Sequence, residues 1–175
     1  MQITKKAIFY PAENPISMPL IHLTTFIEAP VERVFDLCRN IQLHKESMKQ
    51  HKEEAVAGTR FGLIEKDETV TWKAKHFFKT RILRIKITEM QKPLRFVDEQ
   101  SQGSFKEMKH EHFFKSCENG TIMIDMFHFE SPYGAIGKWL NTFYLTRYMK
   151  KLIRHRNKTI KEYAESNKWK PLLER

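Results

Sequence analysis

Residues 105–130 read FKEMKHEHFFKSCENGTIMIDMFHFE, and this stretch carries the strongest fold signal in the chain. Two runs rich in β-forming residues, Phe105 to Ser116 and Thr121 to Glu130, flank the dipeptide Asn119-Gly120. Both central residues of a type I′ turn need a positive φ, which Asn and Gly tolerate best. The stretch therefore predicts a β-hairpin with Asn119 and Gly120 as its two-residue loop.

The register of this hairpin sorts its side chains onto two faces, because directly opposed residues share a face and alternate residues of a strand do so too. One face is then charged and wet and the other is aromatic and buried, with the pairs Glu111–His128 and Lys109–Glu130 on the first and His112–Phe127 and His110–Phe129 on the second. In this register Asp125 shares a face with Phe114, which predicts a buried, hydrogen-bonded carboxyl group.

The chain before the hairpin continues the strand pattern. Turn residues at Lys79-Thr80, Lys92-Pro93 and Gln102-Gly103 separate further runs of β-forming residues. The predicted strands span Ile21 to Ala29, Glu54 to Gly58, Thr69 to Phe77, Ile82 to Glu89 and Arg95 to Ser101. The sequence leaves open whether Asp98 or Val97 of the last of these points inward.

Helical spacing of apolar residues occurs in three places. Pro30 stands at the start of a helix over Val31 to Cys38, and a second short helix is predicted from about Ile41 to Met48. After Pro132, one long amphipathic helix is predicted from a stripe of apolar residues: Ile136, Leu140, Phe143, Tyr144, Tyr148, Leu152, Ile153, Ile160 and Tyr163. A helix of this length needs a large apolar surface, which the concave face of the sheet supplies.

The other face of that helix is basic and carries Lys150, Lys151, Arg154, Arg156, Lys158 and Lys161. Of the 31 Lys and Arg residues, 11 lie in 132–175, so this segment contributes most of the net charge of +10. Such a face attracts nucleic acid, anionic lipid or an acidic partner, although a solvated helix face has the same composition.

The composition predicts one ordered globular domain. The chain has 175 residues, of which 41% are hydrophobic, enough for one core but not for two. We expect the domain to span 20–168, between an irregular N-terminal extension over 1–19 and a tail over 169–175.

Neither a membrane span nor a signal peptide is evident, which predicts a cytoplasmic protein. Cys38 and Cys117 lie on different predicted elements and are expected to be free thiols.

The order of these elements resembles the START, polyketide-cyclase and birch-pollen-allergen superfamily, often called SRPBCC. Four stretches carry the resemblance, which covers roughly residues 20 to 165: TVTWKAKHF at 69–77, RFVDE at 95–99, FKEMKHEHF at 105–113 and SPYGAIG at 131–137. They are similar to a bacterial subgroup of cyclase-like or, loosely, cell-division-inhibitor-like proteins.

The resemblance implies an α+β helix-grip fold, in which a curved antiparallel sheet of about seven strands wraps around a long C-terminal helix, with two short helices after the first strand. It also implies a cavity between sheet and helix, used across the superfamily to carry lipids, sterols, hormones or polyketides and in some branches to catalyse cyclisation or hydrolysis. Fold alone does not select among these functions, and no catalytic signature carries over to this sequence.

Three histidines, His76, His110 and His112, are predicted on the concave face. They suit polar recognition of a ligand, zinc binding, or general acid–base catalysis with Asp98 or Asp125 as the orienting carboxylate. These five residues are the catalytic candidates, although no nucleophile, phosphate loop or paired-carboxylate motif accompanies them. We expect neither a resident metal nor a cofactor.

We therefore expect a protein that binds or carries a small, largely hydrophobic ligand in an internal cavity. The predicted lining comprises Trp72, His76, Ile85, Met108, His110, His112, Phe114, Phe127, Phe129, Phe143 and Tyr144. Two alternatives remain. One is a cyclase- or hydrolase-type enzyme that uses a cavity histidine as general acid or base. The other is an interaction module that binds an anionic surface weakly through the basic helix face.

Overall fold

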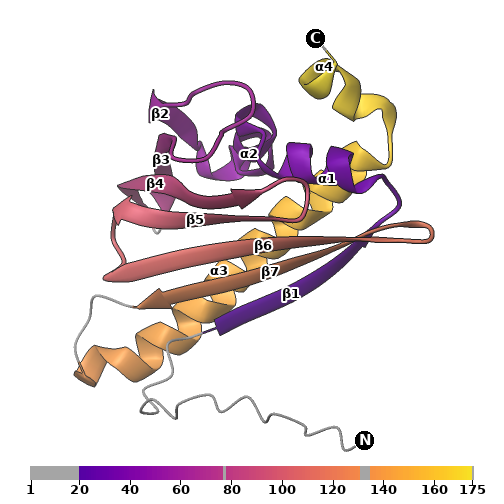
Figure 1. Ribbon diagram of the computed structural model, residues 1–175. Coiled ribbons are helices and arrows are strands. Elements are labelled where there is room, and N and C mark those ends of the chain that lie inside the picture. Colours follow the sequence, from indigo (N-terminus) through magenta and orange to yellow (C-terminus); the bar gives the residue numbers. More distant parts are fainter. Residues whose placement is uncertain (1–19, 77, 131–134, 175) are drawn as a thin grey trace, which may run out of the picture.

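The computed structural model describes residues 20–76, 78–130 and 135–174, with side chains from residue 143 onward in the last of these ranges (Figure 1). The predicted extension over 1–19 lies outside the described residues, and so do the side chains of Ile136 and Leu140.

An antiparallel sheet of seven strands forms the body of the described domain. Across the sheet, the order is β1 (Leu20–Ile27), β7 (Gly120–Glu130), β6 (Glu107–Cys117), β5 (Arg95–Gln102), β4 (Lys79–Gln91), β3 (Thr69–His76) and β2 (Glu54–Gly58). The first and last strands of the chain are therefore neighbours. The chain crosses from β1 to the opposite edge through α1 (Val31–Cys38), α2 (Ile41–Ser47) and the short helix η1 (Lys49–His51).

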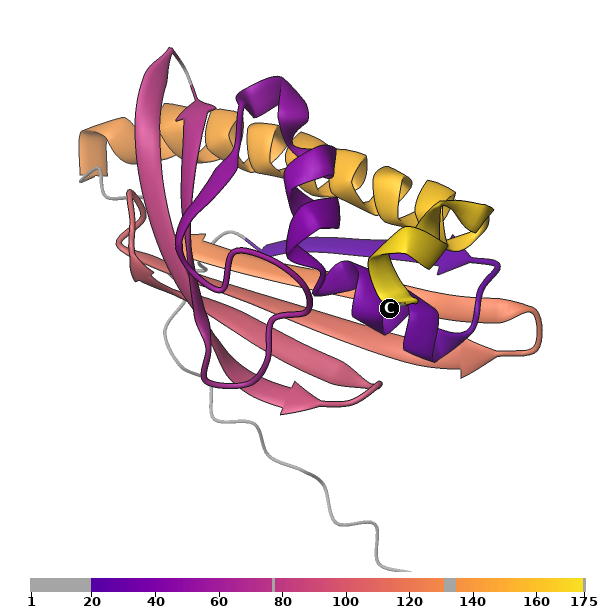
Figure 2. The ribbon, with the colours of Figure 1, turned by 90° about the horizontal axis from the view of Figure 1, so that it is seen from above.

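The long helix α3 (Ala135–Ala164) and the two short helices lie on the same side of the sheet (Figure 2). Phe35 of α1 packs edge-on against Phe96 and Phe114, with ring centroids 5.6 and 5.2 Å apart. This cluster fills the space between sheet and helices where α1 lies. The helix-grip fold predicted from the sequence is confirmed, and none of the described helices is long and apolar enough to cross a membrane.

The sheet bends where its strands lose register. β4 and β5 shift between Arg84 and Ile85 and again between Ile87 and Glu89, and β2 shifts against β3 between Ala55 and Ala57. An extra residue in one strand bends that strand and increases its twist. These irregularities curve the β2–β5 side of the sheet toward α3.

The 105–130 hairpin has the predicted faces but not the predicted pairs. Glu118 and Asn119 form the loop, and Cys117 pairs with Gly120, so the register is displaced by two residues from the prediction. A displacement of two leaves every side chain on its predicted face. The observed pairs include Lys109 with His128, His110 with Phe127 and His112 with Asp125.

The cause of this displacement is a close approach between Gly120 and β1. Its φ is 155°, and a Cβ at this position would lie 2.2 Å from the carbonyl oxygen of Ile27. The glycine is therefore needed inside the strand, next to β1, rather than in the loop. Neither Glu118 nor Asn119 has a positive φ, so the predicted type I′ turn is wrong.

The turn between β3 and β4 was also predicted two residues too late. His76 pairs with Lys79 and Lys75 with Thr80, so Lys79 and Thr80 belong to β4. Phe78 in the loop has a φ of 63° and is almost fully exposed.

Among the described side chains of α3, three differ from the predicted pattern. Phe143 and Tyr144 of the predicted apolar stripe are 74% and 61% exposed, because the neighbouring Leu145 takes the inward position in that turn. Arg156 was predicted on the solvated basic face, but only 7% of it is exposed, since it lies one helical turn after the buried Leu152. The other predicted basic residues remain at least partly exposed.

The C-terminal part of α3 is tied to the first strand and the first helix by polar contacts. Lys161 Nζ donates to the carbonyl oxygen of Phe26 at 2.9 Å, and Arg33 Nη1 donates to that of Ala164 at 3.0 Å. The amide of Glu28 donates to Glu165 Oε1 at 2.7 Å. This end of the helix is therefore fixed in position.

The segment predicted as a tail, 169–175, starts at the last residue of η2 (Asn167–Trp169) and contains α4 (Lys170–Leu173). The guanidinium of Arg33 lies 4.1 Å from the centroid of the Trp169 ring, and Asn40 Nδ2 donates to the carbonyl oxygen of Leu172 at 3.4 Å. These contacts hold the segment against α1 and α2. Cys38 and Cys117 are free thiols, as predicted.

We predict that Gly120→Ala lowers the free energy of unfolding by roughly 2–4 kcal/mol, through backbone strain and the clash with Ile27. Chemical denaturation measures this. Gly103→Ala is the matched control, because the Cβ there meets the side chains of Gln100 and Leu83, not a backbone atom. Equal losses for the two variants would contradict the assigned role of Gly120.

Candidate functional site

Two adjoining hollows lie between the sheet and α3. The inner cavity has a volume of about 160 Å³ and reaches Asp98, His110 and His112, whereas the outer cavity has a volume of about 390 Å³ and reaches Arg81, Ser104 and Tyr144. They adjoin because they share lining residues, namely Glu53, Trp72, His76, Leu83, Phe105, Met149 and Leu152. Most of the lining is apolar, as in small-molecule binding sites.

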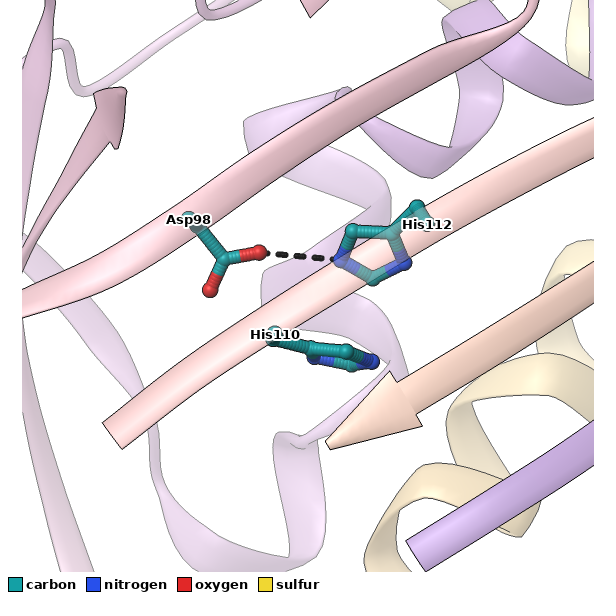
Figure 3. Close-up of side chains that lie close together, drawn as sticks. All are labelled: Asp98, His110 and His112. Carbon is teal, nitrogen blue, oxygen red and sulfur yellow. Dashed lines mark hydrogen bonds and ion pairs between the residues drawn. The ribbon is translucent and has the colours of Figure 1, made fainter. Parts of the chain in front are cut away.

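Three neighbouring strands supply the polar side chains at the inner end. Asp98 on β5 lies opposite His110 on β6, and His112 on β6 lies opposite Asp125 on β7. Figure 3 shows Asp98, His110 and His112 close together. Asp98 is thus the inward residue that the sequence left open, while the adjacent Val97 is buried on the other side of the strand.

A chain of hydrogen bonds joins these side chains. His112 Nε2 lies 2.9 Å from Asp98 Oδ1, and His112 Nδ1 lies 2.9 Å from Asp125 Oδ1. The Nε2 atom of His110 lies 2.9 Å from the same Asp125 oxygen. Two imidazoles therefore share one oxygen of a fully buried carboxylate, which confirms the burial and hydrogen bonding predicted for Asp125.

α3 completes the cluster from the opposite side. Asn157 Nδ2 donates to Asp125 Oδ2 at 2.7 Å, and Arg156 Nη1 lies 3.8 Å from Asp125 Oδ1. Arg156 Nη2 also donates to the carbonyl oxygen and the Sγ atom of Cys38, at 2.8 and 3.1 Å. A cation at this C-terminal end of α1 is favoured by the helix dipole. We refer to Asp98, His110, His112, Asp125, Arg156 and Asn157 as the Asp125 network.

The protonation states of the network follow from its contacts. Burial by itself lowers the pKa of His112, but electrostatic interaction with Cys38 and hydrogen bonds to Asp125 and Asp98 outweigh it and hold that pKa well above the usual value. Burial by itself raises the pKa of both carboxyl groups, yet their hydrogen bonds to the histidines lower it, strongly for Asp125. His112 is therefore an imidazolium between two carboxylates.

His110 is in the opposite state. Burial, and then the charge of the neighbouring His112, lower the pKa of His110 below the usual value. At neutral pH this ring is uncharged, with its proton on Nε2, where it is donated to Asp125. The network then has two carboxylates against one imidazolium and one guanidinium, so its charges balance, as a buried ionic cluster requires.

Three atoms of the network keep a lone pair without a hydrogen-bond partner among the described residues. They are the second carboxylate oxygen of Asp98, the Nδ1 atom of His110 and the Oδ1 atom of Asn157. Asn157 Oδ1 is covered by protein atoms, whereas the side chains of Asp98 and His110 line the inner cavity. The polar floor of the cavity therefore presents hydrogen-bond acceptors.

The donor set suits hydrogen bonding better than zinc binding. A ring nitrogen of His110, one of His112 and an oxygen of Asp98 lie within 4.8 Å of one another. Both ring nitrogens of His112, however, already lie 2.9 Å from a carboxylate oxygen, of Asp98 and of Asp125, and a metal ligand must be a neutral imidazole. His76 is not part of this group, and its Nδ1 is hydrogen-bonded to Tyr148 Oη at 2.7 Å. Asp98 and His110 alone fall short of the three protein ligands of a catalytic zinc site.

The predicted lining residues have three different locations. Those at the inner cavity are Trp72, His76, Ile85, Met108, His110, His112 and Phe127, while Tyr144 lies at the outer cavity. Phe114 and Phe129 line neither hollow, because both pack in the hydrophobic core. Phe143 points to solvent, so it does not line the described hollows.

Three residues of the site were missed by the sequence analysis: Arg156, Asn157 and Cys38. Arg156 and Asn157 follow Leu152 and Ile153 by one helical turn, and this phase is the signal that places them on the inward face. Their polarity made them look like surface residues. Cys38 gave no signal, since its role depends on contact with Arg156, which is 118 residues away in sequence.

Comparisons with known proteins agree with the fold described above. No family model and no curated protein matches the sequence at a significant level. Among solved structures, TTHA0849 from Thermus thermophilus is 20% identical, covering 83% of this chain and 97% of that chain with a TM-score of 0.68. A START superfamily protein from Mycobacterium smegmatis is 10% identical, with coverage of 83% and 97% and a TM-score of 0.64.

The di-domain ARO/CYC StfQ from the steffimycin biosynthetic pathway is 11% identical, with a TM-score of 0.67; the match covers 83% of this chain and 50% of that one. At such identities the likeness establishes the fold alone. This fold is the one that the sequence resemblance to the START and polyketide-cyclase superfamily predicted.

We predict opposite protonation states for the two network histidines at pH 7. Nitrogen-15 NMR should show His112 protonated on both ring nitrogens and still protonated as the pH rises past its usual pKa of about 6.5. His110 should carry one proton, on Nε2, and remain neutral as the pH falls past the same value. Asp98→Asn should lower the pKa of His112, because it removes one of the two carboxylates. A neutral His112 at pH 7 would contradict the charge assignment.

Proposed function

We propose that this protein binds a small, largely apolar molecule in the cavity between its sheet and α3. The observation that carries the proposal is an apolar cavity in two connected parts that ends on a charge-balanced polar floor. A well-packed core leaves few voids larger than a water molecule. A hollow of about 390 Å³ that continues into one of about 160 Å³ departs from that rule.

The lining matches the composition expected of a ligand site. Apolar side chains from β3, β4, β6 and α3 surround the hollow, and a cluster of charged groups lies at its inner end. Further polar residues, among them Glu53, Arg81 and Ser104, line the outer cavity. Burial of the apolar part of a ligand along the walls is favourable. A polar group at the end of the ligand can keep a hydrogen bond at the floor and so avoids the cost of burial without one. The solved structures of the same fold include a START superfamily protein and an aromatase/cyclase, which is consistent with a ligand-binding role.

Filling the cavity should abolish binding. Leu83 lines both hollows, so Leu83→Trp should place an indole ring between them and weaken binding of the fluorescent dye 1-anilinonaphthalene-8-sulfonate at least about tenfold, or ~1.4 kcal/mol. Dye titration followed by fluorescence measures the change. Arg84→Trp is the control, because it adds the same ring at an exposed position on the same strand. Unchanged binding in a folded Leu83→Trp protein would refute the proposal.

A second function is favoured by one specific observation, the orientation of His110. Its Nε2 is bonded to Asp125 and its Nδ1 has no partner among the described residues, which is the arrangement of an oriented general base. Its lowered pKa keeps the lone pair free at neutral pH. An enzyme that removes a proton from a bound ligand would use this geometry.

This second function is testable without knowledge of the natural substrate. The probe 5-nitrobenzisoxazole loses its ring C–H proton to a base, its N–O bond breaks, and a cyanophenolate forms. His110→Gln should slow this reaction by about 10²-fold or more, the usual contribution of a positioned base. His155→Gln, on the exposed face of α3, should leave the rate unchanged. Equal rates in all three proteins would remove the enzymatic function.

A further inference from the structure

The polar floor of the inner cavity specifies the chemistry of the ligand more narrowly than the apolar walls do. We propose that the ligand is an uncharged molecule with a hydroxyl group at its inner end, a phenol or an alcohol, whose single O–H hydrogen is shared between Asp98 and His110 in a three-centre hydrogen bond. This inference rests on the proposed binding function and names its ligand class. It follows from the charge balance of the Asp125 network, from the open lone pairs of Asp98 and His110, and from the contacts that the nearby hydrogen-bond donors make within the protein.

The charge balance of the Asp125 network selects an uncharged ligand end. The negative charges of Asp98 and Asp125 are already matched by the positive charges of His112 and Arg156. All four residues are buried, with at most 9% of their surface exposed. A carboxylate or an ammonium group at the floor would add an unmatched charge in a desolvated place, which is costly. A neutral polar group avoids this cost.

The open atoms of the floor select a donor. The free oxygen of Asp98 and the Nδ1 atom of His110 are acceptors, and neither can donate in the protonation states derived above. A buried acceptor without a partner loses the free energy of its hydration. A ligand hydroxyl supplies the missing hydrogen, whereas an ether, a ketone or a hydrocarbon cannot.

Two donor side chains that line the inner cavity, Arg39 and His44, are engaged within the protein. Arg39 is bonded to Asp36 and Glu65, and His44 Nε2 lies 2.9 Å from Glu53 Oε1. These side chains are therefore not available to a ligand acceptor such as a carbonyl group.

Asn40 and Arg156 are two further donor side chains at the inner cavity. Asn40 Nδ2 donates to the carbonyl oxygen of Leu172. Arg156 uses Nη2 for Cys38. Its Nη1 has no hydrogen-bond partner in the described part of the chain, but this atom is covered by protein atoms and lies 3.8 Å from Asp125 Oδ1. The open groups of the floor are therefore the acceptors of Asp98 and His110.

Four probes that share one ring system test this inference by calorimetric titration of the wild-type protein: 2-naphthol, 2-methoxynaphthalene, 2-naphthoate and 2-naphthylmethylammonium. We expect 2-naphthol to bind roughly 10- to 100-fold more tightly than the methyl ether, since a hydrogen bond to a charged acceptor contributes about that much. The carboxylate and the ammonium should bind more weakly than 2-naphthol.

The residue dependence of this preference is the second part of the test. His110→Phe keeps an aromatic ring but removes the acceptor, so the preference for 2-naphthol over its methyl ether should fall. His155→Phe, on the exposed face of α3, should leave the preference unchanged.

The outcomes separate this inference from the function on which it rests. If none of the four probes binds, the cavity-binding proposal itself fails and the inference fails with it. If the methyl ether equals 2-naphthol, or if the carboxylate or the ammonium binds most tightly, the hydroxyl assignment is overturned while the binding function stands. These wild-type measurements do not depend on whether the His110→Phe protein folds.

Discussion

The carboxylate of Asp125 is the group on which the arrangement of this protein depends. It is fully buried on β7, the strand next to the edge strand β1, and a buried carboxylate is stable only with matched charge and hydrogen bonds. Its partners come from β6, which supplies His110 and His112, and from α3, which supplies Arg156 and Asn157. The need to satisfy one anion therefore fixes the height and rotation of the long helix over the sheet.

The same requirement explains why the cavity has a polar end at all. An apolar residue in place of Asp125 would leave the buried His112 and Arg156 with one carboxylate fewer, which is costly. With the carboxylate present, His112 must stay protonated and His110 must turn its Nε2 toward the anion, which leaves the opposite nitrogen of His110 open. Binding chemistry at the floor is thus a consequence of the way in which the anion is stabilised.

Much of the fold could be predicted from sequence because strand alternation and helix spacing are local patterns. The faces of the 105–130 hairpin were predicted correctly even though its register was displaced, since a displacement of two residues preserves the face. The pairs were not, because the position of Gly120 is set by the carbonyl oxygen of Ile27 on a third strand, about 90 residues away in sequence. No local pattern contains that contact.

The site could be predicted only in part for a similar reason. His110, His112, Asp98 and Asp125 all belong to strands, where alternation assigns a face, and they were identified as candidates. Arg156 was assigned to solvent because its charge was given more weight than its phase on the helix. The burial of an arginine can be predicted only if the anion that pairs with it is known. Here that anion, Asp125, lies on a different element.

The uneven attachment of α3 has a kinetic consequence. Around Arg156 and from Lys161 to Glu165 the helix is held by several ionic and polar contacts. Near Met149 and Leu152 it borders the hollow, and the hydrogen bond between Tyr148 and His76 links it to β3 there. Separation of the C-terminal part of α3 from the sheet would remove the partners of the buried Asp125 carboxylate. That part of the helix is therefore expected to stay in place when the other end moves. Exchange of a bound molecule would then proceed at the Tyr144 end of the cavity, and the side chains there, rather than those that recognise the ligand, would set its residence time.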